Sequence, residues 1–102
     1  MPERVVTKVL SVQYAMDILM FLHDNGEIKQ MKMQSRFSSN NDILAKRLSL
    51  LLDSDLATVE LRKCDESRHH AKYWKLTQKG ERIAELINQM EHVYKGTELL
   101  DE

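Results

Sequence analysis

The spacing of the apolar residues changes twice along this chain of 102 residues. Up to Leu52 they recur every three or four residues, which is the period of an amphipathic helix. Between Ala57 and Leu76 they recur every second residue, which is the period of a half-buried strand. From Ile83 onward the helical spacing returns. The sequence therefore predicts a mainly α fold with one small β-hairpin (α+β), and residues 1–102 have the length of a single domain.

Turn and capping residues divide the first half of the chain into helices. Residues 12–24 predict a helix that ends before Gly26. Residues 27–34 predict a two-turn helix with Ile28 and Met31 turned inward. The apolar stripe of the first helix extends back into the N-terminal arm (Val5, Val9, Val12, Met16 and Leu19).

The polar segment 38–42 is rich in residues that cap helices. We expect the helix that it opens to bury Leu44, Leu48 and Leu51, with Ile43 and Leu52 widening the stripe, and to end at about residues 53–55. Ala57, Val59 and Leu61 then alternate with polar residues in the first strand of the hairpin. The polar tract 64–70 forms its tip.

The last predicted helix spans residues 78–96, with Thr77 as its N-cap and Gly96 at its end. Its apolar residues form a face wider than one small domain can cover by itself. They are Ile83, Leu86, Ile87, Met90, Val93 and Tyr94. We therefore expect a homodimer held by this helix; the alternative is that the stripe packs only on the chain's own first helix.

The middle of the chain is basic although the whole chain has a net charge of -1. Residues 29–79 contain eleven Lys or Arg and six Asp or Glu, which gives +5. The segments before and after it are acidic. A local basic surface is the usual requirement for binding phosphate backbones, although a pI of about 6.4 is far from that of a histone.

The predicted order of elements is that of a winged helix-turn-helix domain. Residues 18–22, 44–52, 56–59 and 73–80 resemble blocks of MarR-, HxlR- and PadR-like regulators, over about residues 12 to 95. The most specific block is Trp74-x-Leu76-Thr77-x-x-Gly80, which in those families ends the wing and enters the final helix. The pattern is most similar to small archaeal winged-helix proteins that dimerise through a long C-terminal coiled-coil helix.

This resemblance implies a helix-turn-helix plus wing over residues 12–77 and a dimerisation helix over 78–96. One departure concerns the junction between the recognition helix and the first wing strand. The families usually place a glycine there because the residue needs a positive φ, whereas this chain has Asp53-Ser54-Asp55.

The implied function is that of a sequence-specific, DNA-binding transcriptional regulator. Such proteins lay the recognition helix in the major groove and the wing on the backbone or minor groove. The candidate DNA-binding residues in the turn and the recognition helix are Arg36, Ser38, Ser39, Asn40, Asn41, Lys46 and Arg47. Those in the wing are Arg62, Lys63, Arg68, His69, His70 and Lys72.

Asparagine can pair with adenine, and lysine and arginine can reach phosphates or guanine. Residues 39–42 could instead only cap the helix, and a charged hairpin tip is often simply solvated. Two other functions remain open: a winged helix that serves as a protein-interaction module, and architectural DNA binding without sequence preference.

Other classes of function have little support in the sequence. No apolar segment approaches the roughly 20 residues that cross a bilayer, and no secretory signal is recognisable, so we expect a cytoplasmic protein. Cys64 is the single cysteine, which excludes an internal disulfide. It could act as a redox sensor, and together with His69 and His70 it is too small a set to predict a metal site. We expect no enzyme activity, no cofactor and no metal; whether a small-molecule effector exists is open.

Overall fold

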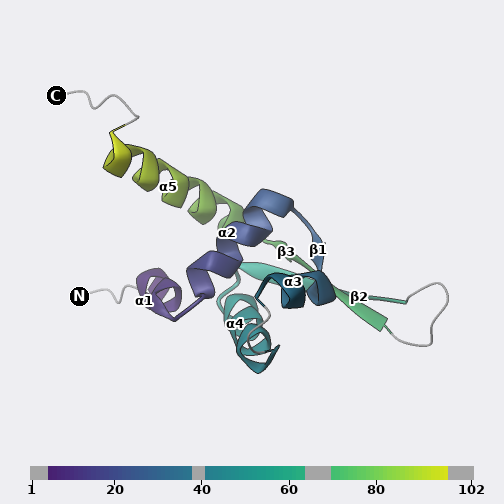
Figure 1. The fold of residues 1–102 in the computed structure, drawn as a ribbon. Helices are drawn as coiled ribbons and strands as arrows, with labels where there is room; N and C mark the ends of the chain where they lie inside the picture. The colour runs from purple at the N-terminus through teal and green to yellow at the C-terminus, as the bar shows by residue number, and fades with distance from the viewer. Residues whose placement is uncertain (1–4, 38–40, 64–69, 97–102) are drawn as a thin grey trace.

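The computed structural model describes residues 5–37, 41–63 and 70–96 (Figure 1). It contains five helices and one three-stranded antiparallel sheet within these ranges. In chain order the elements are α1 (Val5–Ser11), α2 (Ala15–Asn25), β1 (Ile28–Lys29), α3 (Gln30–Arg36), α4 (Asn41–Asp53), β2 (Ala57–Lys63), β3 (His70–Leu76) and α5 (Gln78–Lys95). This order confirms the predicted α+β architecture with a hairpin before a long last helix.

The N-terminal helical stripe is broken, so the predicted single helix over residues 12–24 is wrong at its start. α1 ends at Ser11 and α2 begins at Ala15. Tyr14 between them has a φ of 70°, in the left-handed region that non-glycine residues rarely adopt. Because the apolar spacing is the same on both sides of this break, the sequence pattern does not reveal it. The break lets α1 pack against α2 as a separate helix.

The predicted two-turn helix over residues 27–34 also begins later than expected. Ile28–Lys29 form β1, which pairs with β3 so that Ile28 lies opposite Trp74. Two residues are too few to show an alternating pattern, which is why the strand escapes sequence analysis. The later start changes the inward-facing side of α3: Met33 is fully buried, whereas Met31, predicted inward, is 67% exposed.

The sheet has the strand order β1-β3-β2, and the predicted hairpin of β2 and β3 is confirmed. Its register runs from Ala57 opposite Leu76 to Lys63 opposite His70. Figure 1 shows that the hairpin extends away from the helices. Leu61 was predicted to face inward but is largely exposed, because the hairpin has passed beyond the core at that level.

The core forms where α2, α4 and the sheet meet. Leu44, Leu48 and Leu51 on α4 are buried as predicted and pack with apolar residues of α2 and the sheet. Ile43 is half-buried, whereas Leu52, predicted to widen this stripe, is 40% exposed. α4 ends at Asp53, within the predicted range.

Both predicted ends of α5 are confirmed. The Thr77 side chain accepts a hydrogen bond from the Gly80 N–H at 3.0 Å. Gly96 adopts a φ of 73° and its N–H bonds to the last turn of the helix. Near its start the helix lies against the main chain of Leu56, since a Cβ placed on Gly80 would lie 2.1 Å from the Leu56 carbonyl oxygen. This contact fixes the direction in which α5 leaves the domain.

Candidate nucleic-acid interface

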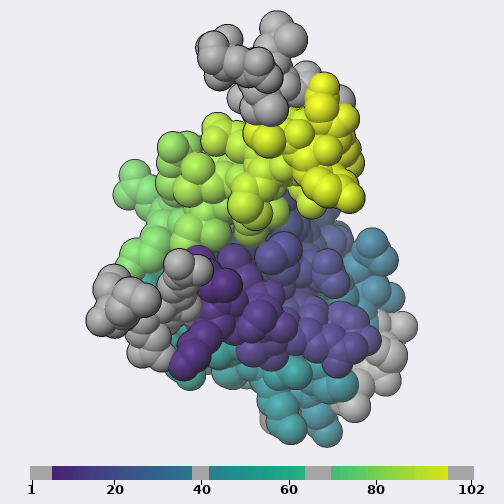
Figure 2. Space-filling view, turned by 90° about the vertical axis from the view of Figure 1, so that its left-hand side faces the viewer, coloured from purple at the N-terminus to yellow at the C-terminus, as the bar shows by residue number. Residues whose placement is uncertain are grey.

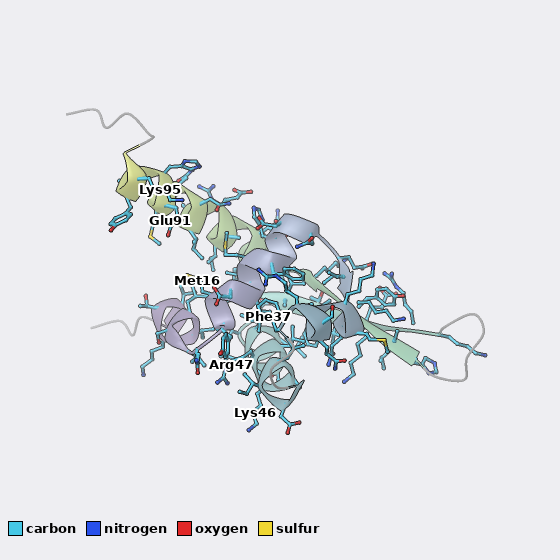
Figure 3. The ribbon with its side chains drawn as sticks, viewed as in Figure 1. Met16, Phe37, Lys46, Arg47, Glu91 and Lys95 are labelled. Atoms are coloured by element: carbon cyan, nitrogen blue, oxygen red, sulfur yellow. The ribbon has the colours of Figure 1, made fainter. Side chains whose placement is uncertain are left out.

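The predicted recognition helix, α4, has one buried face and one exposed face. The exposed side chains include Asp42, Ala45, Lys46 and Ser49, on the side of α4 away from its buried leucines. Figure 3 shows Lys46 pointing away from the body of the molecule. Through the short turn at residues 54–56 the helix leads directly into β2. α4 therefore carries an exposed face with a lysine and is joined to the hairpin by a short turn.

Arg47 occupies a different position from its neighbour Lys46. Its Nε donates a hydrogen bond of 2.7 Å to the carbonyl oxygen of Gln13, in the turn between α1 and α2 (Figure 3). The side chain is half-buried. Arg47 thus holds α4 to the turn between α1 and α2, and its Nε–H is already engaged in this hydrogen bond.

The register of the hairpin separates the predicted wing residues into two sets. Lys63 lies opposite His70 and Leu61 lies opposite Lys72. Because side chains alternate across a strand, these four share the side of the sheet that carries Trp74 in the core. All four are exposed, so this side of the wing carries two lysines and one histidine.

Arg62 points to the other side of the sheet and is surrounded by carboxylates. Its Nη1 lies 2.7 Å from Oε1 of Glu27, and its Nη2 lies 3.0 Å from Oε2 of Glu60. Its guanidinium carbon lies 4.5 Å from the centre of the Tyr73 ring. Hydrogen bonds from Arg62 lower the pKa of Glu60, and those to Glu60 and Glu27 raise the pKa of Arg62. Arg62 is therefore held by two acids.

Glu27 was not among the residues that the sequence singled out. Its partner Arg62 lies 35 positions later in the chain, and neither helical nor strand spacing relates the two. The change from an acidic N-terminal segment to a basic middle is the only sequence feature that bears on this pair.

Arg36 ends α3 and is exposed. Its guanidinium carbon lies 5.8 Å from the centre of the Phe37 ring, which packs edge-on against Phe21. Arg36 also borders a shallow groove that contains Asp17 and Asp24. The arginine therefore lies near two acids rather than in a purely basic patch.

Ser38, Ser39, Asn40, Arg68 and His69 lie outside the described residues, as does Cys64. Asn41 is the first residue of α4.

Among the residues that the structure describes, no three His, Cys, Asp or Glu side chains gather in a way that could hold a metal ion. None of the helices in the described ranges combines the length and the apolar character that a bilayer crossing needs.

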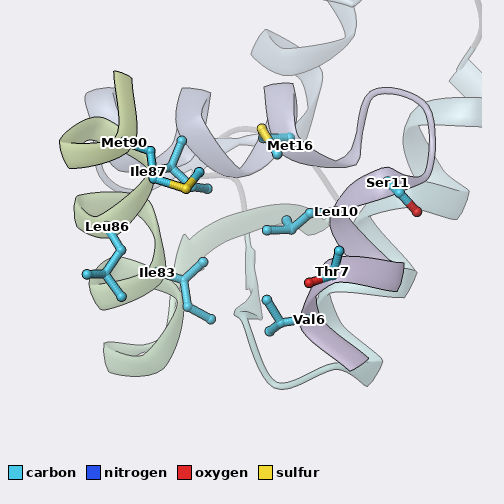
Figure 4. A pocket seen from close by; sticks show the side chains of 9 residues that line it. All are labelled: Val6, Thr7, Leu10, Ser11, Met16, Ile83, Leu86, Ile87 and Met90. Carbon is cyan, nitrogen blue, oxygen red and sulfur yellow. The ribbon is translucent and has the colours of Figure 1, made fainter. Parts of the chain in front are cut away.

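A second surface of interest is the apolar groove between α1 and α5, with a volume of about 440 Å³. Figure 2 shows both helices on one face of the molecule, and Figure 4 shows Ile83 and Ile87 of α5 pointing toward α1. The groove is lined mainly by Val6, Leu10, Met16, Ile83, Leu86 and Met90. We call this surface the α1–α5 face.

The six residues predicted for the dimer interface divide between core and surface. Ile87 is buried in its own chain and Ile83 packs partly against the core. Leu86, Met90 and Val93 are 43%, 60% and 42% exposed, and Tyr94 is 88% exposed. α1, which the sequence did not assign to this interface, supplies the opposite wall of the groove.

Comparison with solved structures identifies the architecture. A transcriptional regulator homologue from Pyrococcus horikoshii OT3 superimposes with a TM-score of 0.73 over 93% of each chain, at 17% sequence identity. The chain has the winged helix-turn-helix fold. Reduced YodB, a transcriptional regulator from B. subtilis, matches this winged helix with a TM-score of 0.72 at 14% identity over 89% of each chain.

The transcriptional regulator HlyU from Vibrio vulnificus CMCP6 is a further similar structure. It matches the winged helix with a TM-score of 0.65 at 21% identity, over 84% of this chain and 83% of that one. No protein-family model and no curated protein sequence matches the chain. The likeness is therefore one of fold.

Proposed function

We propose that the protein is a homodimeric, sequence-specific DNA-binding transcriptional regulator that acts in the cytoplasm. The proposal is carried by the exposure of Lys46 on α4, the element that leads into a wing with Lys63, Lys72 and His70 on one side. Transcriptional regulators with the same fold support it.

In this proposal the exposed face of α4 enters the major groove and supplies base contacts. Lys46, Lys63 and Lys72 bind phosphates, which supply much of the affinity and its dependence on salt. His70 lies on the same side of the wing as Lys63 and Lys72. Arg47 contributes indirectly by holding α4 to the turn before α2.

The proposed dimer pairs two copies through the α1–α5 face. The exposed apolar side chains of α5 would be covered by the partner, and two recognition helices would lie at a fixed separation. Dimeric helix-turn-helix proteins use such a separation to match half-sites about 34 Å apart.

Binding of duplex DNA at a series of salt concentrations tests the proposal. We expect the variant K63A/K72A to bind more weakly. Its plot of log K against log salt should be shallower, with a slope smaller in magnitude by about 1.8, since each neutralised phosphate contributes about 0.9. K46A should lower the slope by about 0.9. The matched control is Lys95→Ala, which removes an exposed lysine at the far end of α5 (Figure 3).

The outcomes separate the three candidate functions. If the wild-type chain does not bind duplex DNA at low salt, the protein-interaction module replaces this proposal; Asp42 and Asp53 on α4 would suit a basic partner. If selection from a random DNA pool enriches no sequence, binding is architectural. An equal loss in K95A and K46A would mean that overall charge, and not this surface, determines binding.

A further inference from the structure

We infer that Arg62 is a positioning residue that fixes the wing to the start of the helix-turn-helix, so that Lys63 and Lys72, and not Arg62, meet the phosphates. The part of this inference that concerns DNA rests on the function proposed above. The part that concerns the wing's attachment can be measured in the free protein.

The first observation is that the Arg62 side chain reaches across the sheet. The strand order is β1-β3-β2, so β1 and β2 are the two edge strands. Arg62 belongs to β2, whereas Glu27 immediately precedes β1. The guanidinium lies over Tyr73 of the central strand, β3, and reaches Glu27 at 2.7 Å. One side chain therefore connects both edges over the middle strand.

The second observation is where along the sheet this connection lies. β1 pairs with β3 only at Ile28–Trp74 and Lys29–Tyr73. Beyond Tyr73 only the β2–β3 pairs continue, beginning with Leu61 opposite Lys72 and Arg62 opposite Ala71. A two-stranded ribbon is marginally stable by itself in water. Arg62 thus lies in the two-stranded part of the wing and reaches back to Glu27, at the end of β1 that is farther from the hairpin tip.

The third observation is what Glu27 belongs to. It follows Gly26, the C-cap of α2, and leads through the two residues of β1 into α3. A contact to Glu27 therefore ties the wing to the segment between α2 and α3. The orientation of Lys63 and Lys72 relative to α4 then depends on a side chain on the opposite side of the sheet.

The charge around Arg62 supports a positioning role over a phosphate contact. The carboxylates of Glu27 and Glu60 both lie within 3.0 Å of its guanidinium nitrogens. A phosphate would have to displace at least one of them while the other repelled it. Lys63 and Lys72 share the side of the wing from which these carboxylates are turned away.

The variant Glu27→Gln distinguishes the two roles by the sign of its effect. If Arg62 bound phosphate, loss of a competing carboxylate would raise DNA affinity. If Arg62 positions the wing, E27Q weakens binding by about two- to fivefold, the range expected for an exposed ion pair. Arg62→Met should weaken binding at least as much, and Arg62→Lys should restore part of the loss, since it keeps a charge for Glu27 without the planar fork.

A second measurement reports on the wing without DNA. Amide hydrogen exchange in the free protein should become faster at residues 61–63 and 70–72 in R62M and E27Q, while protection in α2 and α4 stays unchanged. Arg82→Met is the matched control, because it removes an exposed arginine from an ion pair within α5 at 3.0 Å. It should leave the exchange of the wing unchanged.

Three results would overturn the inference: a higher DNA affinity in E27Q, a salt slope lowered by about 0.9 in R62M relative to R82M, or unchanged exchange in the wing of R62M. If the wild-type protein binds no DNA, the proposed function fails, and the exchange experiment still decides whether Arg62 fixes the wing.

Discussion

The turn after α4 shows how a single residue substitutes for a glycine. Asp55 has a φ of 62°, in the left-handed region where glycine is the usual residue. Aspartate tolerates this region better than most residues because its side chain is short and polar. The Thr77 hydroxyl donates a hydrogen bond of 2.7 Å to the Asp55 carbonyl, and Lys79 lies 3.2 Å from its carboxylate. The unusual residue is thus held by the start of α5.

At the same scale, the contact with Arg62 leads us to expect a lowered pKa for Glu60. The guanidinium lowers the pKa of this carboxyl from its ordinary value of 4.5. The contribution of the pair to stability is therefore fully present above that value and is lost as the pH falls through the lower pKa of the folded protein. Carbon-detected NMR titration should give a midpoint below 4.5 for Glu60 in the wild type and a higher midpoint in R62M.

The R82M variant, whose lost charge lies on α5, should leave the Glu60 midpoint where it is in the wild type. A wild-type midpoint at or above 4.5 would contradict the arrangement of Glu60 and Arg62 described here.

Among the elements, α5 depends most on one close contact. The position of Gly80 leaves no room for a side chain, because an added Cβ would lie 2.1 Å from a main-chain oxygen that cannot turn aside. The same oxygen, that of Leu56, accepts a hydrogen bond from the Thr77 N–H at 3.0 Å. The last helix and the α4–β2 turn are therefore joined through their main chains.

We expect Gly80→Ala to lower the free energy of unfolding by about 2 to 3 kcal/mol, in the upper part of the range for overpacked sites. Chemical denaturation measures this loss. The control is Gly96→Ala, whose new methyl group would have open space around it. This variant should lose only about 1 kcal/mol, because alanine is strained at the positive φ of position 96. If the two variants lost the same stability, the contact with Leu56 would not be the reason for a glycine at position 80.

The elements that could be predicted from the sequence are those with long patterns and clear caps. α4 and α5 each carry a sustained apolar stripe, and Thr77 and Gly96 mark the ends of the last helix. β1 could not be predicted because two residues carry no pattern, and the break at Tyr14 could not because the stripe continues across it. The element order was therefore predictable, while the third strand and the separate α1 were not.

The candidate site was predictable only as a set of residues. The sequence indicates which lysines and arginines lie in the middle of the chain, but their pairing depends on tertiary contacts. Arg47 bonds to a carbonyl 34 positions earlier, and Arg62 to an acid 35 positions earlier. These contacts separate residues that hold the fold from residues such as Lys46 that remain exposed.

At the scale of the whole molecule, the α1–α5 face is an apolar surface that a single copy leaves partly exposed. Leu86 and Met90 border the groove and are largely exposed, whereas Ile87 belongs to the core of its own chain. A variant aimed at the interface should therefore change the first two and spare Ile87. Because Ile87 is left in the core, a loss of association in such a variant cannot be caused by a loss of folding at that residue.

We expect L86E/M90E to be a monomer in sedimentation, with wild-type helix content and much weaker DNA binding, because two charges cannot be buried at an apolar interface without a large cost. The wild-type chain should sediment with twice the mass of 12.0 kDa. T58E/Q78E adds the same charge at exposed positions away from this face and should remain dimeric. A wild-type monomer at micromolar concentration would refute the dimer.

The main-chain contact at Gly80 has a consequence for how sequences with this fold can diverge. Core positions such as Leu48 accept several apolar residues of suitable volume, and exposed positions accept almost any polar residue. The contact with Leu56 disfavours every side chain at position 80, because even a Cβ would lie 2.1 Å from the Leu56 carbonyl oxygen. Substitutions can therefore accumulate over most of the chain at little cost, while a side chain at position 80, at a fixed distance after the wing, lowers the stability of the fold.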